Sequence, residues 1–121
     1  MLIKDLYKVF DVNKNDDLLK FSIQLNSEHK IFEGHFPGNP VLPGVVQLQI
    51  IKDVFEEKFN SKFQIISIKD VKYPAVIQPF NQVYFELKYK SDSEKLINVS
   101  GEITQAEKLC TKVKFKLSPV T

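Results

Sequence analysis

The first part of the chain alternates apolar and polar residues in the way that is typical of paired strands. Residues 19–25 alternate strictly, with apolar side chains at the odd positions, as in a strand with one buried face. Residues 2–12 fit either a helical stripe or a strand, and we favour a short helical turn followed by a strand from about Tyr7. The Asn and Asp residues of 13–17 are typical of a turn. A hairpin is therefore predicted.

A helical pattern begins at Pro43 and continues for about 17 residues. Proline is favoured at the first helical position, because its missing N–H would have no partner there. Apolar residues recur three and four positions apart between Val46 and Phe59, which makes a wide apolar stripe. The polar residues of the other side are Gln49, Lys52, Asp53, Glu56 and Asn60. We predict one long helix that is buried over most of its girth.

After the helix the pattern returns to a period of two in four segments. Residues 63–71 are apolar on both faces, as expected of a central strand, and 83–90, 97–103 and 109–117 alternate more clearly. The prolines of 73–81 exclude regular ladder pairing there. A single apolar helix and an antiparallel sheet can bury their faces only against each other. The predicted fold is α+β, with the sheet wrapped around one central helix, which is a hot-dog fold.

Composition narrows the class of protein further. With 121 residues, the chain is predicted to form one domain over 1–121, and a net charge of +2 from dispersed lysines argues against a nucleic-acid surface. A charged residue follows the first three positions, so we expect no signal peptide, no membrane span and a cytoplasmic protein. The single cysteine, Cys110, has no partner for a disulfide or a metal site and is expected to fill space in the core.

One segment, residues 32–49, combines chemistry with unusual backbone restraint. It contains three prolines, three glycines and His35, and it leads directly into the predicted helix. Proline and glycine fix backbone shape in different ways, and histidine is the side chain that titrates nearest to neutral pH. This combination is typical of an active-site loop. No comparable motif surrounds the other histidine, His29, for which we predict a structural role.

The run from Gly34 to Val45, GHFPGNPVLPGV, resembles the signature loop of the beta-hydroxyacyl-acyl-carrier-protein dehydratases, and the order of elements matches over nearly the whole chain. The resemblance implies that the protein dehydrates 3-hydroxyacyl thioesters to trans-2-enoyl thioesters in fatty-acid or polyene biosynthesis. It also implies that His35 is the catalytic base, and imidazole suits such proton transfer near neutral pH.

The resemblance further implies a substrate-binding role for Gly38 and Gly44, whose surroundings supply backbone amides to the thioester oxygen, and for Phe36 and Val45. The physical chemistry agrees, because a helix N-terminus presents free N–H groups and partial positive charge. Glycine also lets a substrate approach the backbone closely. For each glycine alone, the needs of the turn explain its presence equally well.

Gln49 departs from the pattern of the family, which carries a carboxylic acid at this position. An amide holds a hydroxyl by hydrogen bonding but cannot deliver a proton to it. Asp53 follows one turn later on the same helix face, about 6 Å along the axis, within reach through a water or a shifted substrate. The alternative for Asp53 is a solvated or interface residue on the polar stripe. Both residues are kept as candidate catalytic residues beside His35.

Three functions remain open from the sequence. The first is an active dehydratase in which His35 makes both proton transfers or is helped by Gln49, Asp53 or water. The second is a catalytically impaired subunit that binds acyl chains or pairs with an active dehydratase, and the third is an acyl thioesterase. An altered helix residue beside such a loop also resembles the hot-dog dehydratases of aryl-polyene and flexirubin pathways.

The resemblance also implies the partners. Family members are dimers with His from one chain and the acid from the helix of the other, so a homodimer, or a heterodimer with another hot-dog dehydratase, is expected. The substrate arrives on the phosphopantetheine arm of an acidic acyl carrier protein, and Lys69, Lys72, Lys88 and Lys90 are candidates to receive it, although a solvated sheet face explains them equally well. No metal and no organic cofactor is expected, since the sequence has no ligand cluster and no phosphate-binding loop.

Overall fold

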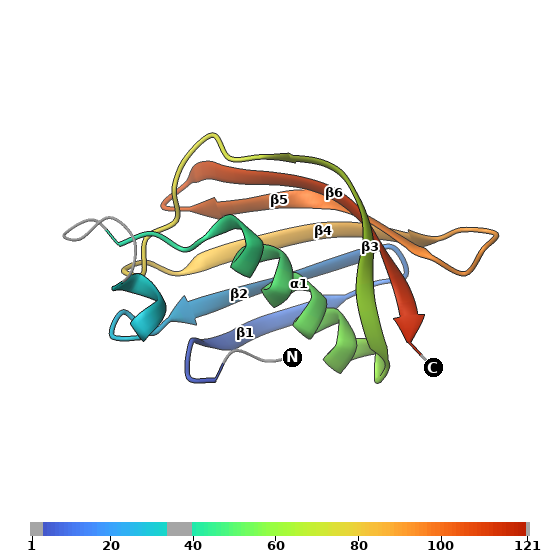
Figure 1. The fold of residues 1–121 in the computed structure, drawn as a ribbon, viewed down its shortest axis with the longest axis horizontal. Coiled ribbons are helices and arrows are strands. Elements are labelled where there is room, and N and C mark those ends of the chain that lie inside the picture. The colour runs from blue at the N-terminus through green and yellow to red at the C-terminus, as the bar shows by residue number, and fades with distance from the viewer. Residues whose placement is uncertain (1–3, 34–39, 121) are drawn as a thin grey trace.

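The computed structural model describes residues 4–33 and 40–120, in which one antiparallel sheet carries a long helix across one face (Figure 1). The elements are β1 (Tyr7–Lys14), β2 (Leu18–Leu25), the 3-10 helix η1 (Lys30–Phe32), α1 (Gly44–Phe59), β3 (Lys62–Lys72), β4 (Val83–Ser91), β5 (Ile97–Gln105) and β6 (Lys108–Val120). The six strands are ordered β1-β2-β4-β5-β6-β3. The predicted hot-dog architecture is confirmed, as are the first hairpin and the interruption between β3 and β4.

Helix α1 begins one residue later than the sequence predicted. Pro43 has extended backbone angles, φ −60° and ψ 146°, so it is the N-cap and Gly44 is the first helical residue. The helix ends at Phe59, because Asn60 follows in the left-handed conformation that stops helices. Its buried residues cover most of its circumference, as predicted, and they pack on the inner face of the sheet.

An aromatic cluster joins the C-terminal half of α1 to the sheet. Phe55 is fully buried, and its ring stacks on that of Phe59 with 5.6 Å between centroids. The ring of Tyr89 on β4 meets both edge-on, at 5.6 Å and 5.3 Å. Such edge-to-face contacts add to the burial of apolar area. The cluster fixes the position of the helix relative to β4.

The position of β3 corrects one prediction. Its run of apolar residues on both faces indicated a central strand, but β3 is the last strand of the sheet and, in the part of the chain that the structure describes, pairs only with β6. Ile66 and Ile68 on this strand are 43% and 55% exposed. A long edge strand presents unpaired backbone groups, and exposed isoleucines on it favour pairing with another chain.

Within the described residues, no helix is long and apolar enough to cross a membrane.

Gly101 on β5 lies where neighbouring backbone leaves no room for a side chain. A Cβ atom there would be 2.1 Å from the carbonyl oxygen of Glu86 and 2.8 Å from Cα of Leu87. Because backbone cannot swing aside as a side chain does, Gly101→Ala is expected to lower the free energy of unfolding by about 1–3 kcal/mol. Urea unfolding measures the change. Ser100→Ala next to it is the control, with a much smaller effect expected, and equal midpoints for the two variants would contradict the steric explanation.

Candidate active site

The predicted site is only partly described. His35, Phe36 and Gly38 lie outside the described residues, so their roles stay predictions. The structure does place Gly44 and Val45 in the first turn of α1, and it places Gln49 and Asp53 further along the same helix. The geometry of the site is therefore given by α1 and the segments that pack around it.

The N-terminus of α1 presents two backbone amides without an intrahelical partner. The carbonyl oxygen of Pro43 accepts hydrogen bonds from the amides of Val46 at 3.1 Å and Gln47 at 3.2 Å, so those of Gly44 and Val45 precede the first helical bonds. The cap residue makes no side-chain hydrogen bond to them. Free amides and the helix dipole together favour negative charge. This turn is chemically suited to hold a thioester oxygen as it gains charge.

Tyr73, which sequence analysis did not single out, packs directly on this turn. A Cβ atom on Gly44 would lie 2.3 Å from the Tyr73 hydroxyl oxygen and 2.5 Å from its Cζ. Glycine leaves room for this close approach, whereas any larger residue at position 44 would require the Tyr73 ring to move. Burial raises the pKa of the Tyr73 hydroxyl, which keeps it a hydrogen-bond donor. No periodic signal marks this residue, because it follows the end of β3.

Gln47 anchors the segment that leads into the helix. Its Nε2 donates to the carbonyl oxygen of Leu42 at 3.1 Å, and its Oε1 accepts from the hydroxyl of Thr111 on β6 at 2.5 Å. The amide of Leu42 in turn donates to the carbonyl oxygen of Ile77 at 2.7 Å. Gln47 and Thr111 are both buried, so this bridge is shielded from water. Its signal in the sequence is a polar residue inside the apolar stripe of the helix.

Gln49 and Asp53 form a hydrogen-bonded pair on α1. Nε2 of Gln49 donates to Oδ1 of Asp53 at 2.9 Å, and the hydroxyl of Tyr7 on β1 donates to Oδ2 at 3.4 Å. The ammonium of Lys52 lies 3.8 Å from Oδ1. Asp53 is only 3% exposed, so of the two alternatives to a catalytic role, a solvated or an interface residue, the solvated one does not hold within this chain. The physical reason is that Tyr7 of β1 contacts this side of the helix and shields the carboxylate.

Tyr7 supports this arrangement as a proton donor. Burial raises the pKa of its hydroxyl well above the usual value, and the neighbouring negative charge of Asp53 and the hydrogen bond to it act in the same direction. The hydroxyl thus stays protonated and keeps donating to Asp53. Each carboxylate oxygen then has a donor, and the donation from Nε2 fixes the orientation of the Gln49 amide. The sequence carries no signal for this role of Tyr7, because its contact with α1 is purely tertiary.

A groove of about 550 Å³ between β1 and α1 reaches the Asp53 carboxylate. Its lining residues are Lys4, Asp5, Tyr7, Lys8, Val9, Asp53, Val54 and Glu57. Asp53 belongs to the wall of this groove, and its side chain is only 1% exposed. Among the described residues, no three His, Cys, Asp or Glu side chains gather as they would around a metal ion.

The structure assigns His29 and Cys110 to structural roles. Nδ1 of His29 accepts from the amide of Ile31 at 3.0 Å, and Nε2 lies 2.9 Å from the carbonyl oxygen of Lys4. Through Nδ1 the ring caps the N-terminus of η1. Cys110 is buried, as predicted, and burial raises the pKa of its thiol.

Comparison with known proteins supports the same family. The family model of the ApeI-like proteins, described as ApeI dehydratase, matches residues 11–115. The 3-hydroxyacyl-acyl-carrier-protein dehydratase FabZ of Lactiplantibacillus plantarum is 25% identical, over 91% of this chain and 84% of that protein. FabZ of Rickettsia felis is 24% identical, over 94% of this chain and 82% of that protein. Both relatives are dehydratases by name.

Solved structures agree on the fold. The dehydratase heterocomplex ApeI:P from Xenorhabdus doucetiae matches with a TM-score of 0.71 and 22% identity, over 95% of this chain and 98% of that chain. The PaaI protein of Escherichia coli matches with a TM-score of 0.66 but 9% identity, over 93% of this chain and 80% of that chain. The family model spans most of the chain, and the protein therefore belongs to the ApeI-like family of hot-dog dehydratases.

Proposed function

We propose that the chain removes water from 3-hydroxyacyl thioesters carried by acyl carrier protein and releases trans-2-enoyl thioesters, in the cytoplasm. The observation that supports this most directly is the Gln49–Asp53 pair on α1, the helix whose first two amides have no intrahelical partner. Gln49 lies five residues after Gly44, about 7.5 Å along the helix axis. That separation allows one substrate to place its thioester oxygen at the amides and its 3-hydroxyl at Gln49.

His35 makes both proton transfers in this proposal. Its imidazole takes a proton from the alpha carbon, the electrons of that C–H bond form the C=C bond, and the bond from C3 to the hydroxyl oxygen breaks. The leaving oxygen receives the proton from His35 and departs as water, so the histidine returns to its starting state. The amides of Gly44 and Val45 stabilise the thioester oxygen while the charge develops. No cofactor beyond the phosphopantetheine arm takes part.

Gln49 and Asp53 position the hydroxyl end of the substrate. The amide cannot supply a proton at neutral pH, but it can bind the 3-hydroxyl and direct it toward the histidine. The buried carboxylate of Asp53 orients that amide through its 2.9 Å hydrogen bond, while the hydroxyl of Tyr7 holds the other oxygen. The carboxylate thus lies one helical turn beyond the position where the family carries it. In this proposal it orients the Gln49 amide and does not transfer the proton itself.

A dimer built along β3 is part of the proposal. The edge of β3 and its exposed Ile66 and Ile68 provide a surface on which a second chain can extend the sheet. The solved ApeI:P protein is by name a heterocomplex of dehydratases. We propose a homodimer, or a heterodimer with another hot-dog dehydratase, in which His35 of one protomer faces α1 of its partner.

Incubation of the purified protein with a 3-hydroxyacyl carrier protein tests the function. Mass spectrometry is expected to show loss of one water from the acyl chain, with the thioester bond intact. Release of free 3-hydroxy acid would instead identify a thioesterase. An inert wild type that Gln49→Glu activates would contradict the proposal and identify an impaired subunit, because the family carboxylate would then be the missing part.

A further inference from the structure

One tyrosine hydroxyl lies at the start of α1, and the proposed chemistry does not use it. A Cβ atom on Gly44 would lie 2.3 Å from the hydroxyl oxygen of Tyr73. The bonds that join Cα to Cβ and to the amide nitrogen are each about 1.5 Å long, so this oxygen is at most about 4 Å from Cα of Gly44 and about 5 Å from its amide nitrogen. The hydroxyl is therefore a close neighbour of the first free amide of the helix.

The hydroxyl lies on the side of Gly44 to which the free amides point. In an α-helix every Cα–Cβ bond is tilted toward the N-terminus, so the space that a Cβ atom of Gly44 would fill is at the N-terminal end of α1. The amides of Gly44 and Val45, which precede the first helical hydrogen bonds, open toward the same end. Two donors that are about 5 Å apart can both reach one acceptor at ordinary hydrogen-bond lengths. One ligand oxygen can thus accept from an amide and from the Tyr73 hydroxyl together.

The Tyr73 hydroxyl makes no hydrogen bond among the residues that the structure describes. The sequence has four tyrosines, and the hydroxyls of the other three each donate to a protein atom, Tyr7 to Asp53, Tyr84 to Gln82 and Tyr89 to the carbonyl oxygen of Asn15. Tyr73 is also 49% exposed, so a ligand can reach it. A phenol that lies beside free amides and has no acceptor in the described fold is available to a bound molecule.

The backbone on both sides of Tyr73 is held by β6. The pairing of β3 with β6 continues to Lys72, and the amide of Ala75 donates to the carbonyl oxygen of Cys110 at 3.4 Å. Pro74 follows directly and favours extended backbone at Tyr73. The hydroxyl is thus in place before a ligand binds. A donor that is already in place needs little reorganisation when charge develops beside it.

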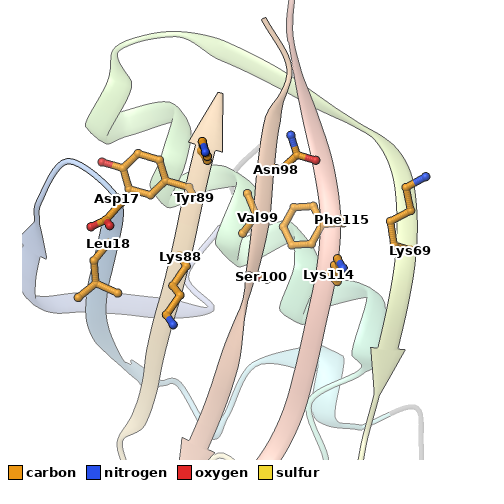
Figure 2. Close-up of a pocket in the computed structure, with 11 residues that line it drawn as sticks. Asp17, Leu18, Lys69, Lys88, Tyr89, Asn98, Val99, Ser100, Lys114 and Phe115 are labelled. Atoms are coloured by element: carbon orange, nitrogen blue, oxygen red, sulfur yellow. The ribbon is translucent and has the colours of Figure 1, made fainter. Parts of the chain in front are cut away.

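The lysines of the outer sheet face are not suited to this role. Figure 2 shows a groove of about 590 Å³ on that face, where Lys88 and Lys114 lie, with α1 behind the strands. Lys88 stands between Leu87 and Tyr89, which are buried on the inner face, so its side chain points away from the helix. The sheet separates these ammonium groups from the start of α1, whereas Tyr73 packs directly on it.

We propose that the Tyr73 hydroxyl donates a third hydrogen bond to the thioester oxygen, beside the amides of Gly44 and Val45. This rests on the proposed function, which brings that oxygen to the start of α1. Negative charge builds up on the oxygen as the alpha proton leaves, so a donor there stabilises the transition state more than the bound substrate. The hydroxyl keeps its proton throughout, and burial raises its pKa, which favours the protonated form.

Tyr73→Phe tests the hydroxyl alone, because it keeps the ring that packs on Gly44. The variant is expected to lower kcat for 3-hydroxyacyl carrier protein about 30-fold, the effect of one lost hydrogen bond to a charged oxygen, with little change in KM. Its unfolding temperature should equal that of the wild type, since the hydroxyl has no acceptor in the described fold. Tyr84→Phe is the matched control, because Tyr84 is 51% exposed on β4 and its hydroxyl bonds to Gln82, so kcat should stay unchanged.

Infrared difference spectroscopy tests the contact without turnover. The probe is butyryl-N-acetylcysteamine with ¹³C at the thioester carbonyl, which has no 3-hydroxyl to lose. Each hydrogen bond to the carbonyl oxygen weakens the C=O bond and lowers its stretching frequency. The bound probe is therefore expected to absorb at a lower frequency in the wild type and in Tyr84→Phe than in Tyr73→Phe.

The outcomes separate this inference from the proposed function. An unchanged kcat in Tyr73→Phe would overturn the inference. The same carbonyl frequency in Tyr73→Phe and the wild type would overturn it even if kcat falls, because the hydroxyl would then act through packing. A wild type that does not bind the probe would overturn it as well. A wild type that shows the frequency difference but dehydrates no substrate would reject the function and keep the contact.

Discussion

Replacing His35 with alanine is expected to lower kcat/KM for dehydration by about 10²- to 10⁴-fold, the usual contribution of general acid–base transfer. The effect lies at the upper end of that range if His35 makes both transfers, because removal of the side chain then stops proton abstraction and proton return together. The rate of enoyl product formation, measured by mass spectrometry at substrate concentrations below KM, gives kcat/KM directly.

His29→Ala is the matched control for this experiment. His29 caps η1 through Nδ1, so its loss is expected to cost about 0.5–2 kcal/mol of stability and to leave kcat/KM unchanged. A His35→Ala variant that keeps more than a tenth of wild-type activity would contradict the assignment of the base. Thermal unfolding of both variants shows whether any loss of activity arises from unfolding.

Asp53→Asn is expected to lower kcat about 10²-fold with little change in KM, because misplacement of a reacting group by about 1 Å has an effect of that size. Asparagine keeps the volume of the side chain but presents one acceptor oxygen where Gln49 and Tyr7 now reach two. The Gln49 amide then loses its fixed orientation. Single-turnover measurements separate this effect on chemistry from product release.

A second variant distinguishes orientation from simple loss of charge. Gln49→Glu/Asp53→Asn returns a carboxylate to the position where the family carries it and leaves an amide one turn later. The kcat of this double variant is expected to be at least tenfold higher than that of Asp53→Asn, because a carboxyl group at position 49 can deliver a proton as well as bind the hydroxyl. Tyr7→Phe should show a smaller loss of kcat than Asp53→Asn. If Asp53→Asn keeps wild-type activity, Asp53 has no role in the active site.

The elements of the fold were predictable because their signals are local. The period-two runs and the apolar stripe of α1 each depend on side chains a few positions apart, and the structure reproduces all of them with small shifts at the ends. The position of β3 at the edge was not predictable in this way. Strand order is set by pairing between residues far apart in sequence, and an apolar strand has the same pattern at a subunit interface as in the middle of a sheet.

The same distinction between local and long-range signals applies to the candidate site. The helix start, predicted one residue early at Pro43, and the spacing of Gln49 and Asp53 follow from the sequence, since these positions belong to one helix. The burial of Asp53 depends on Tyr7, which reaches it from a different element, β1. The approach of Tyr73 to Gly44 depends on the path of the chain after β3. Helical periodicity shows which side of α1 is polar, but not which tertiary contacts cover that side.

The order of strands also determines when the sheet can be completed during folding. β3 follows α1 directly in the chain, yet its partner within the sheet is β6, the last strand. As the chain emerges from the ribosome, β3 and its isoleucines must wait for nearly all of the remaining sequence before they pair. An unpaired, isoleucine-rich strand is prone to associate with other chains during that interval. The surface that we propose for dimerisation is thus also the segment most exposed to misassembly before folding is complete.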